Sequence, residues 1–152
     1  MIQELIFFIE ATNKLEKVFI SFFQYLNMDL PVKRGFSFAL VSGIITVLGI
    51  MVGLNSSTHS ELVIIGGIVV LAISDSLSDS FGIHVSEESR KGRSQKSVWK
   101  ATISTFVTKL LVVLTFIIPI LIFSLNTAII MGIGWGILLI TIFSYYIAIK
   151  RK

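Results

Sequence analysis

Four long apolar stretches constrain the fold of this chain more than any other feature of its sequence. The predicted spans that contain them cover about residues 36–54, 61–88, 102–123 and 127–149. An α-helix needs about 20 mostly apolar residues to cross a bilayer core about 30 Å thick. Because 54% of the residues are hydrophobic and only 14% are charged, the composition excludes an ordinary soluble domain. The sequence therefore predicts an all-α integral membrane bundle with four transmembrane helices.

The basic residues gather at three places in the chain and indicate its topology. The connections at residues 55–61 and 124–126 contain no Lys or Arg. By the positive-inside rule, both termini and the middle connection are expected in the cytosol, in a multi-pass protein of the cell membrane. Topology thus accounts for the net charge of +4, and no nucleic-acid partner is expected. The basic residues are Lys14, Lys17, Lys33 and Arg34 before the first span, Arg90, Lys91, Arg93, Lys96 and Lys100 in the middle, and Lys150, Arg151 and Lys152 at the end.

The start of the chain has polar residues at helical spacing beside a wide apolar face. Three acidic residues there, Glu4, Glu10 and Glu16, argue against a signal peptide. We therefore divide the chain into an amphipathic helix at residues 1–30 and a four-span transmembrane domain at residues 31–152, with Pro31 at the break. The amphipathic helix can lie in the membrane interface or pack against the cytosolic side of the bundle.

Small residues and one proline indicate how the spans pack. Gly49 and Gly53 form a GxxxG pair in the first span, and such a pair lets helix backbones approach closely in lipid. Pro119 lies near the outer end of the third span, where a kink is tolerated.

Asp75 and Asp79 stand four residues apart after the apolar run at residues 62–73. A carboxylate inside a bilayer costs a few kcal/mol or more, so such acids face a bundle interior or an aqueous cavity and handle cations or protons. Residues at offsets of three and four share one helix face, so Ser78 joins the two acids. If the helix enters from the outer side at Glu61, Asp75 lies about 21 Å along a core about 30 Å thick. Both acids therefore belong to the inner half of the membrane.

The two acids predict a site for a divalent cation, because hard cations take oxygen ligands. The hydroxyls of Ser74, Ser78 and Thr46 offer further oxygens. One protomer supplies too few charges, whereas a two-fold dimer that pairs these faces would bring four carboxylates together. Protons would then compete with the metal for the crowded carboxylates. Exchange of protons for metal follows naturally from such a site.

Lys109 is the basic residue that falls inside a span, at about the depth of Asp79. An ion pair would offset part of the desolvation of both groups. In a metal site, Lys109 would be the counter-charge that keeps the empty site neutral. The alternative is structural: Asp75 bonds to neighbouring hydroxyls or to Lys109, and Asp79 reaches the cytosolic interface. The protein would then be a non-transporting membrane scaffold or regulatory subunit.

His84, Glu87 and Glu88 follow where the second span leaves the membrane. A mixed imidazole and carboxylate cluster suits iron or manganese, although a pair of adjacent acids is also typical of a solvated helix surface. His59, in the outer connection, is interpreted as a surface residue, with an exit-side cation contact as the alternative. The chain has no nucleophile elbow, P-loop or haem motif, so neither an enzyme nor a prosthetic group is expected.

Two runs of the sequence resemble the vacuolar iron transporter family. The first covers residues 34–49, from RGF to SGIITVLG, and the second covers ISDSLSDSFG at residues 73–82 and continues to SEES at residues 86–89. The resemblance extends over about residues 34–150. It implies a homodimer that exports Fe²⁺ or Mn²⁺ from the cytosol in exchange for protons, along a path at the dimer interface lined by the first two spans. Asp75 matches the family's acid in the second span.

The chain departs from the family pattern at several points. The family's first-span motif commonly has an acid where this chain has Ser42, and Asp79 replaces a methionine that serves as a metal ligand. The Glu-rich cytosolic domain is reduced to about residues 87–97, and the fifth span of the family is missing, as in a short prokaryotic member. We expect Asp79 to supply the charge that is missing at Ser42, which would shift the preference towards manganese.

These observations lead to one leading hypothesis. We expect a homodimeric membrane protein that exports divalent transition metal. Its expected partners are membrane lipid, divalent metal ions and a second copy of the chain. A measurement of metal flux would test this hypothesis. The residues expected to bind or gather the metal are Asp75, Asp79, Ser78, Thr46, His84, Glu87 and Glu88.

Overall fold

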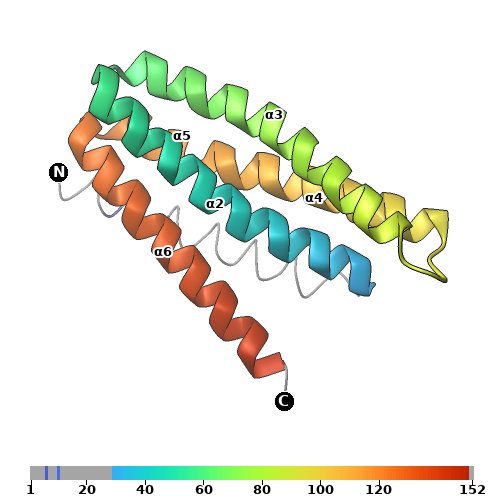
Figure 1. The fold of residues 1–152 in the computed structure, drawn as a ribbon. Coiled ribbons are helices and arrows are strands. Elements are labelled where there is room, and N and C mark those ends of the chain that lie inside the picture. Colours follow the sequence, from blue (N-terminus) through green and yellow to red (C-terminus); the bar gives the residue numbers. More distant parts are fainter. Residues whose placement is uncertain (1–5, 7–9, 11–28, 151–152) are drawn as a thin grey trace.

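The computed structural model of the chain describes residues 6, 10 and 29–150 (Figure 1). Within these residues it contains helices and short connections and no strand. The predicted all-α fold is therefore confirmed. The predicted amphipathic helix at residues 1–30 lies almost entirely outside the described residues. The helices are α2 (Leu30–Thr58), α3 (Glu61–Glu88), α4 (Gln95–Thr115), α5 (Ile117–Ile122) and α6 (Leu125–Lys150).

Four helical segments in the described part of the chain are long and apolar enough to cross a membrane. They are α2, α3, α4 together with α5, and the part of α6 up to Tyr145. At a rise of about 1.5 Å per residue, the 28 residues of α3 extend about 42 Å, more than the apolar core requires. The four predicted spans are thus present as helices, as expected of a multi-pass membrane protein.

The first span begins earlier than predicted. α2 starts at Leu30, and Pro31 lies in its first turn rather than in a break before the helix. Proline suits that position because the missing N–H would have no partner inside the helix there, and its fixed φ matches the helical value. At its other end, His59 adopts a left-handed φ of 51°, and its N–H donates to the Asn55 carbonyl at 3.2 Å. This bond closes α2, so that only His59 and Ser60 separate α2 from α3.

The third span, predicted as one helix with a kink tolerated at Pro119, is interrupted shortly before this proline. α4 ends at Thr115 and α5 begins at Ile117, with Phe116 in a turn between them. Proline cannot donate to the carbonyl four residues before it, and its ring crowds that carbonyl. For Pro119 that carbonyl belongs to Thr115, which explains why the helix breaks there.

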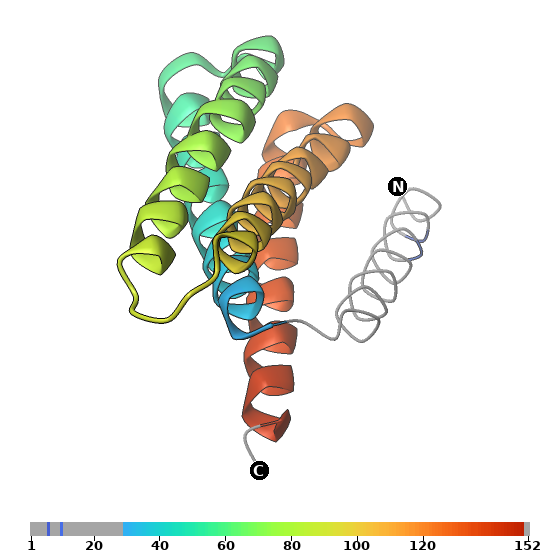
Figure 2. The same ribbon diagram turned by 90° about the vertical axis from the view of Figure 1, so that its right-hand side faces the viewer.

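α2, α3 and α4 contact one another in pairs and enclose the core, while α6 packs on α2 and diverges from it towards its C-terminal end (Figure 1). Figure 2 shows α4 beside α2 and α3. Gly43 lets α2 approach α4, because a Cβ at this position would lie 3.3 Å from Lys109 Cγ. Close approach of α2 and α4 thus occurs at the level of the buried lysine. The core includes Phe36, Leu40, Ile44, Val47, Met51, Ile64, Ile68, Ala72, Val112, Val113 and Phe116.

Candidate functional site: an ion cluster within the spans

Lys109 of α4 reaches both acids of α3. Its side chain is fully buried, with 0% exposure, and its Nζ lies 2.6 Å from Asp75 Oδ2. The same Nζ donates to Asp79 Oδ2 and, at 2.9 Å, to Ser42 Oγ. An ammonium has three N–H donors, and these contacts provide three acceptors. The predicted ion pair of Lys109 is therefore confirmed, and it includes both acids at once.

Two hydroxyls of α2 complete this cluster. Ser42 Oγ donates to Asp79 Oδ2 at 3.0 Å, and Thr46 Oγ1 lies 3.1 Å from Asp75 Oδ2. The hydroxyls are four residues apart on α2, and the acids are four residues apart on α3. Each hydroxyl therefore contacts one acid across the two antiparallel helices. We call Ser42, Thr46, Asp75, Asp79 and Lys109 the ion cluster.

Thr46 has one hydroxyl hydrogen and three acceptors close to it, namely Asp75 Oδ2 and the carbonyls of Ser42 and Gly43. Besides Asp75, the Ser42 carbonyl lies 2.9 Å from Thr46 Oγ1. The hydrogen can therefore turn to the carbonyl of its own helix, which would leave the lone pairs of the hydroxyl oxygen directed to other partners. Thr46 can act as a donor to the carboxylate or as an oxygen ligand, as the sequence analysis expects of it.

Charge and exposure are unevenly distributed in the ion cluster. The side chains of Asp75 and Asp79 are 23% and 18% exposed, whereas that of Lys109 is not exposed. The cation thus lies inside the bundle, and the carboxylates lie at its edge. With all groups ionised, two carboxylates and one ammonium give a net formal charge of −1. The cluster would attract a cation from its carboxylate side.

The remaining polar residues of α3 near the acids do not join the cluster. Ser78 is exposed, and Ser74 donates to the Val70 carbonyl of its own helix at 2.7 Å. On the buried side of α3, Ser80 donates to the Leu77 carbonyl at 2.8 Å. Ser76 Oγ is buried there and has no hydrogen-bond partner among the described residues. The assignment of Ser78 as a ligand remains a prediction that a single protomer does not test.

His84 and Glu88 lie together at the end of α3. His84 Nε2 is 3.7 Å from Glu88 Oε2, and His84 Nδ1 is 2.9 Å from Thr102 Oγ1 of α4. The imidazole also meets the indole of Trp99 edge-on, with ring centroids 4.7 Å apart. Glu88 accepts a hydrogen bond from Gln95 at 3.3 Å. Both nitrogens of His84 are therefore engaged within the protomer.

Glu87 lies apart from that pair. Its side chain is 3% exposed and lies among three guanidinium groups, those of Arg34, Arg90 and Arg93, at 3.5, 3.3 and 3.6 Å. Adjacent residues on a helix point in different directions, and in this protomer Glu87 and Glu88 have different partners. In the described part of the chain, no three His, Asp or Glu side chains are close enough to hold a metal. The role of His84, Glu87 and Glu88 as metal-gathering residues stays a prediction.

Sequence reasoning named Ser42 only as a position where the resembled family commonly has an acid, and it did not identify Arg34 as a partner of Glu87. Ser42 could have been found by register: it precedes Thr46 by four residues, just as Asp75 precedes Asp79 by four. The contact between Arg34 and Glu87 joins residues 53 positions apart and had no local signal.

The ion cluster can bind and release protons or cations, because its acids lie at the edge of the bundle and its ammonium occupies the place of a bound cation. Comparison of the chain with family models, curated proteins and solved structures found no match.

Proposed function

We propose that the protein is a transporter that moves a divalent transition metal, Fe²⁺ or Mn²⁺, out of the cytosol in exchange for protons. The observation that carries the proposal is the contact of Asp75 and Asp79 with one buried ammonium inside three packed spans. Ionisable groups at such a depth are costly, and they characteristically mark ion pathways or proton relays in membrane proteins. The resemblance to vacuolar iron transporters in the first two spans supports the same function.

In the proposed mechanism, Lys109 and the metal compete for the same carboxylates. A divalent cation arriving at the ionised cluster would change its formal charge from −1 to +1. Release of one proton from Lys109 would make the loaded cluster neutral, and a neutral cluster costs least in a medium of low dielectric. Thr46 would turn its hydrogen to the Ser42 carbonyl and offer its oxygen to the metal. Return of a proton to Lys109 would then expel the metal.

A second copy of the chain would complete the coordination. Carboxylates that are 18% and 23% exposed would otherwise face lipid. Gly49 and Gly53 have open space where a Cβ would be, so they face away from the protomer and allow close approach of another helix. We infer a homodimer in which α2 and α3 of both copies meet and the four carboxylates lie close together, with one metal for each Lys109.

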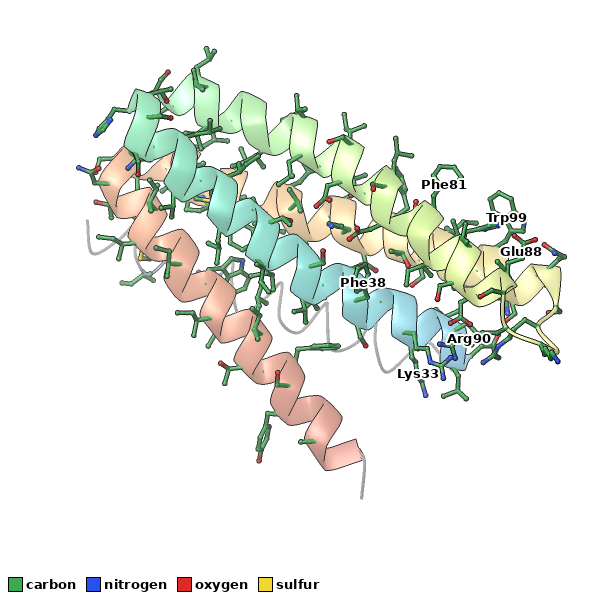
Figure 3. All side chains as sticks on the ribbon, viewed as in Figure 1. Lys33, Phe38, Phe81, Glu88, Arg90 and Trp99 are labelled. Carbon is green, nitrogen blue, oxygen red and sulfur yellow. The ribbon has the colours of Figure 1, made fainter. Side chains whose placement is uncertain are left out.

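The proposed orientation rests on the distribution of charge. Lys33 and Arg90 lie at the same end of the bundle, although they belong to different helices (Figure 3). The opposite end carries the connection of His59 and Ser60. By the positive-inside rule, the basic end is expected on the cytosolic side of the cell membrane. The two acids then lie nearer the side from which the metal would enter.

A structural function is the second candidate, and the saturation of Lys109 favours it. The ammonium already has three acceptors, and it joins α2, α3 and α4 through Ser42, Asp75 and Asp79. Such a cluster can simply fix the packing of three helices in a scaffold or regulatory subunit.

Metal flux into proteoliposomes separates the two functions. Asp75→Asn is expected to abolish proton-coupled uptake of Mn²⁺ or Fe²⁺ and to leave the fold intact. Asp29→Asn is the matched control, because Asp29 is an acid of the same charge that pairs with Lys100 at the surface, with 54% of its side chain exposed. Undiminished coupled flux in Asp75→Asn would exclude the proposed mechanism. Absence of flux in the unaltered protein with either metal would favour the structural function.

A further inference from the structure

The end of α3 carries a second ion cluster that the proposed function does not use. Glu87 lies in the last turn of α3 and is approached by Arg34 from the first turns of α2 and by Arg90 and Arg93 from the connection to α4. We call these four residues the arginine cluster. Three guanidiniums and one carboxylate give it a net formal charge of +2.

The carboxylate of this cluster lies inside and the guanidiniums lie outside. Glu87 has 3% of its side chain exposed, whereas Arg34 and Arg90 have 45% and 48%. The accessible side of the cluster is therefore positive. An arrangement of this kind attracts an anion from outside, while Glu87 holds the guanidiniums together from within.

The guanidiniums have more donors than Glu87 can satisfy. Each has five N–H donors, whereas one carboxylate offers about four acceptor positions. Glu87 Oε2 is buried and accepts no hydrogen bond within the described residues, and Arg93 Nε lies 3.6 Å from it. The contacts among these four residues thus leave both unused donors and an imperfectly matched acceptor. Guanidiniums pair with phosphate oxygens through two parallel bonds, which this surplus of donors would permit.

The position of the cluster indicates where the phosphate comes from. α3 is longer than the apolar core of a bilayer, so we expect its last turn at the depth of the lipid headgroups. Phe38 and Ile45 follow Arg34 on one face of α2 and are 47% and 59% exposed. An apolar stripe therefore leads from the guanidinium of Arg34 towards the membrane centre, as the acyl chain of a lipid would.

We propose that the arginine cluster binds the phosphate of an anionic phospholipid at the cytosolic face of the membrane. Basic pockets between helix ends on this side of membranes are suited to acidic headgroups. Arg34 and Arg90 supply the fork-shaped contacts, and Phe38 packs against the acyl chain. This site does not require metal transport. Because Phe38 and Ile45 lie on the same face of α2 as Gly49, the acyl chain would lie beside the contact between the two copies in the proposed dimer.

Titration of the purified full-length protein in neutral detergent tests the site, with thermal stability and lipid adducts in native mass spectrometry as readouts. The probe is phosphatidylglycerol, compared with phosphatidylcholine and with inorganic phosphate. Phosphatidylglycerol is expected to stabilise the protein and to be retained as one adduct for each copy of the chain. Equal effects of both lipids would overturn the proposal. An equal effect of inorganic phosphate would assign the cluster to a free anion and would overturn the lipid assignment.

Variants separate a specific pocket from general attraction to a basic surface. Arg90→Gln with Arg93→Gln is expected to weaken phosphatidylglycerol binding about tenfold or more, because guanidinium contacts to the phosphate are lost. Lys96→Gln with Lys100→Gln removes the same charge from the same end of the bundle and is expected to have a smaller effect. Equal weakening by the two pairs would overturn the proposal.

Two single variants keep the test decisive if the double arginine variant fails to fold. Arg90→Lys preserves the positive charge but loses the planar guanidinium that can form two parallel hydrogen bonds to a phosphate. The binding of phosphatidylglycerol is therefore expected to weaken. Glu87→Gln raises the net charge of the cluster but removes the carboxylate that holds the guanidiniums together, so the binding of phosphatidylglycerol is expected to weaken. Unchanged binding in Arg90→Lys, or tighter binding in a folded Glu87→Gln protein, would contradict the assigned pocket.

Discussion

Lys109 Nζ lies 2.6 Å from Asp75 Oδ2, and this contact joins α4 to α3 inside the bundle. Because the same ammonium also reaches Asp79 and Ser42, one side chain connects three helices. Buried charges of this kind are expensive to separate, which makes the lysine important to the fold whether or not it also takes part in transport. The two roles must therefore be tested with different substitutions.

Lys109→Met is expected to destabilise the protein by about 3 kcal/mol, because removing one partner of a buried ion pair leaves uncompensated charge. Thermal unfolding in detergent measures the loss. Lys100→Met is the control, since its pair with Asp29 is exposed and worth about 0–1 kcal/mol. Addition of Asp79→Asn to Lys109→Met should restore part of the stability. Equal stability of the two lysine variants would contradict the assigned burial of the ion cluster.

Lys109→Arg separates charge from proton release. Arginine keeps the positive charge but does not lose its proton in proteins, so the proposed exchange cannot occur. We expect this variant to retain more stability than Lys109→Met and to have lost proton-coupled metal flux. Proton release on addition of Mn²⁺, followed with a pH electrode in weak buffer, should occur in the unaltered protein and disappear in the variant. Retention of coupled flux in a folded Lys109→Arg protein would rule out the lysine as the proton carrier.

The sequence was sufficient to predict the helices and the common level of the charged residues along them, because both depend on local composition and on a fixed rise per residue. Asp75, Asp79 and Lys109 could be placed at one level in this way. The contact of Lys109 with both acids could not be predicted from the sequence. This contact depends on the rotation of α4 about its axis and on how closely Gly43 lets α4 approach α2. The contacts of Glu87 with the arginines could not be predicted either, because these arginines belong to α2 and to the connection between α3 and α4.

The two classes of glycine in these helices make a stability prediction. Gly43→Ala places a methyl group 3.3 Å from Lys109 Cγ and 3.4 Å from Val113 Cγ2, and such overpacking costs about 1–3 kcal/mol. Gly134→Ala introduces the same methyl group into open space on α6 and is expected to be neutral or stabilising. Thermal unfolding of the two variants side by side checks the packing of α2 on α4. A neutral Gly43→Ala would show that the two helices are farther apart than described.

The proposed dimer makes the last prediction, and the chain offers a clean background for it because it contains no cysteine. Gly53→Cys lies on the open face of α2, and a two-fold contact of that face brings the two thiols together. Oxidation in native membranes is expected to yield a covalent dimer on a denaturing gel. Ile130→Cys is the control, because Ile130 is 70% exposed on α6, outside the proposed interface. Cross-linking through α6 but not through α2 would place the second copy elsewhere and leave the carboxylates of one protomer without those of its partner.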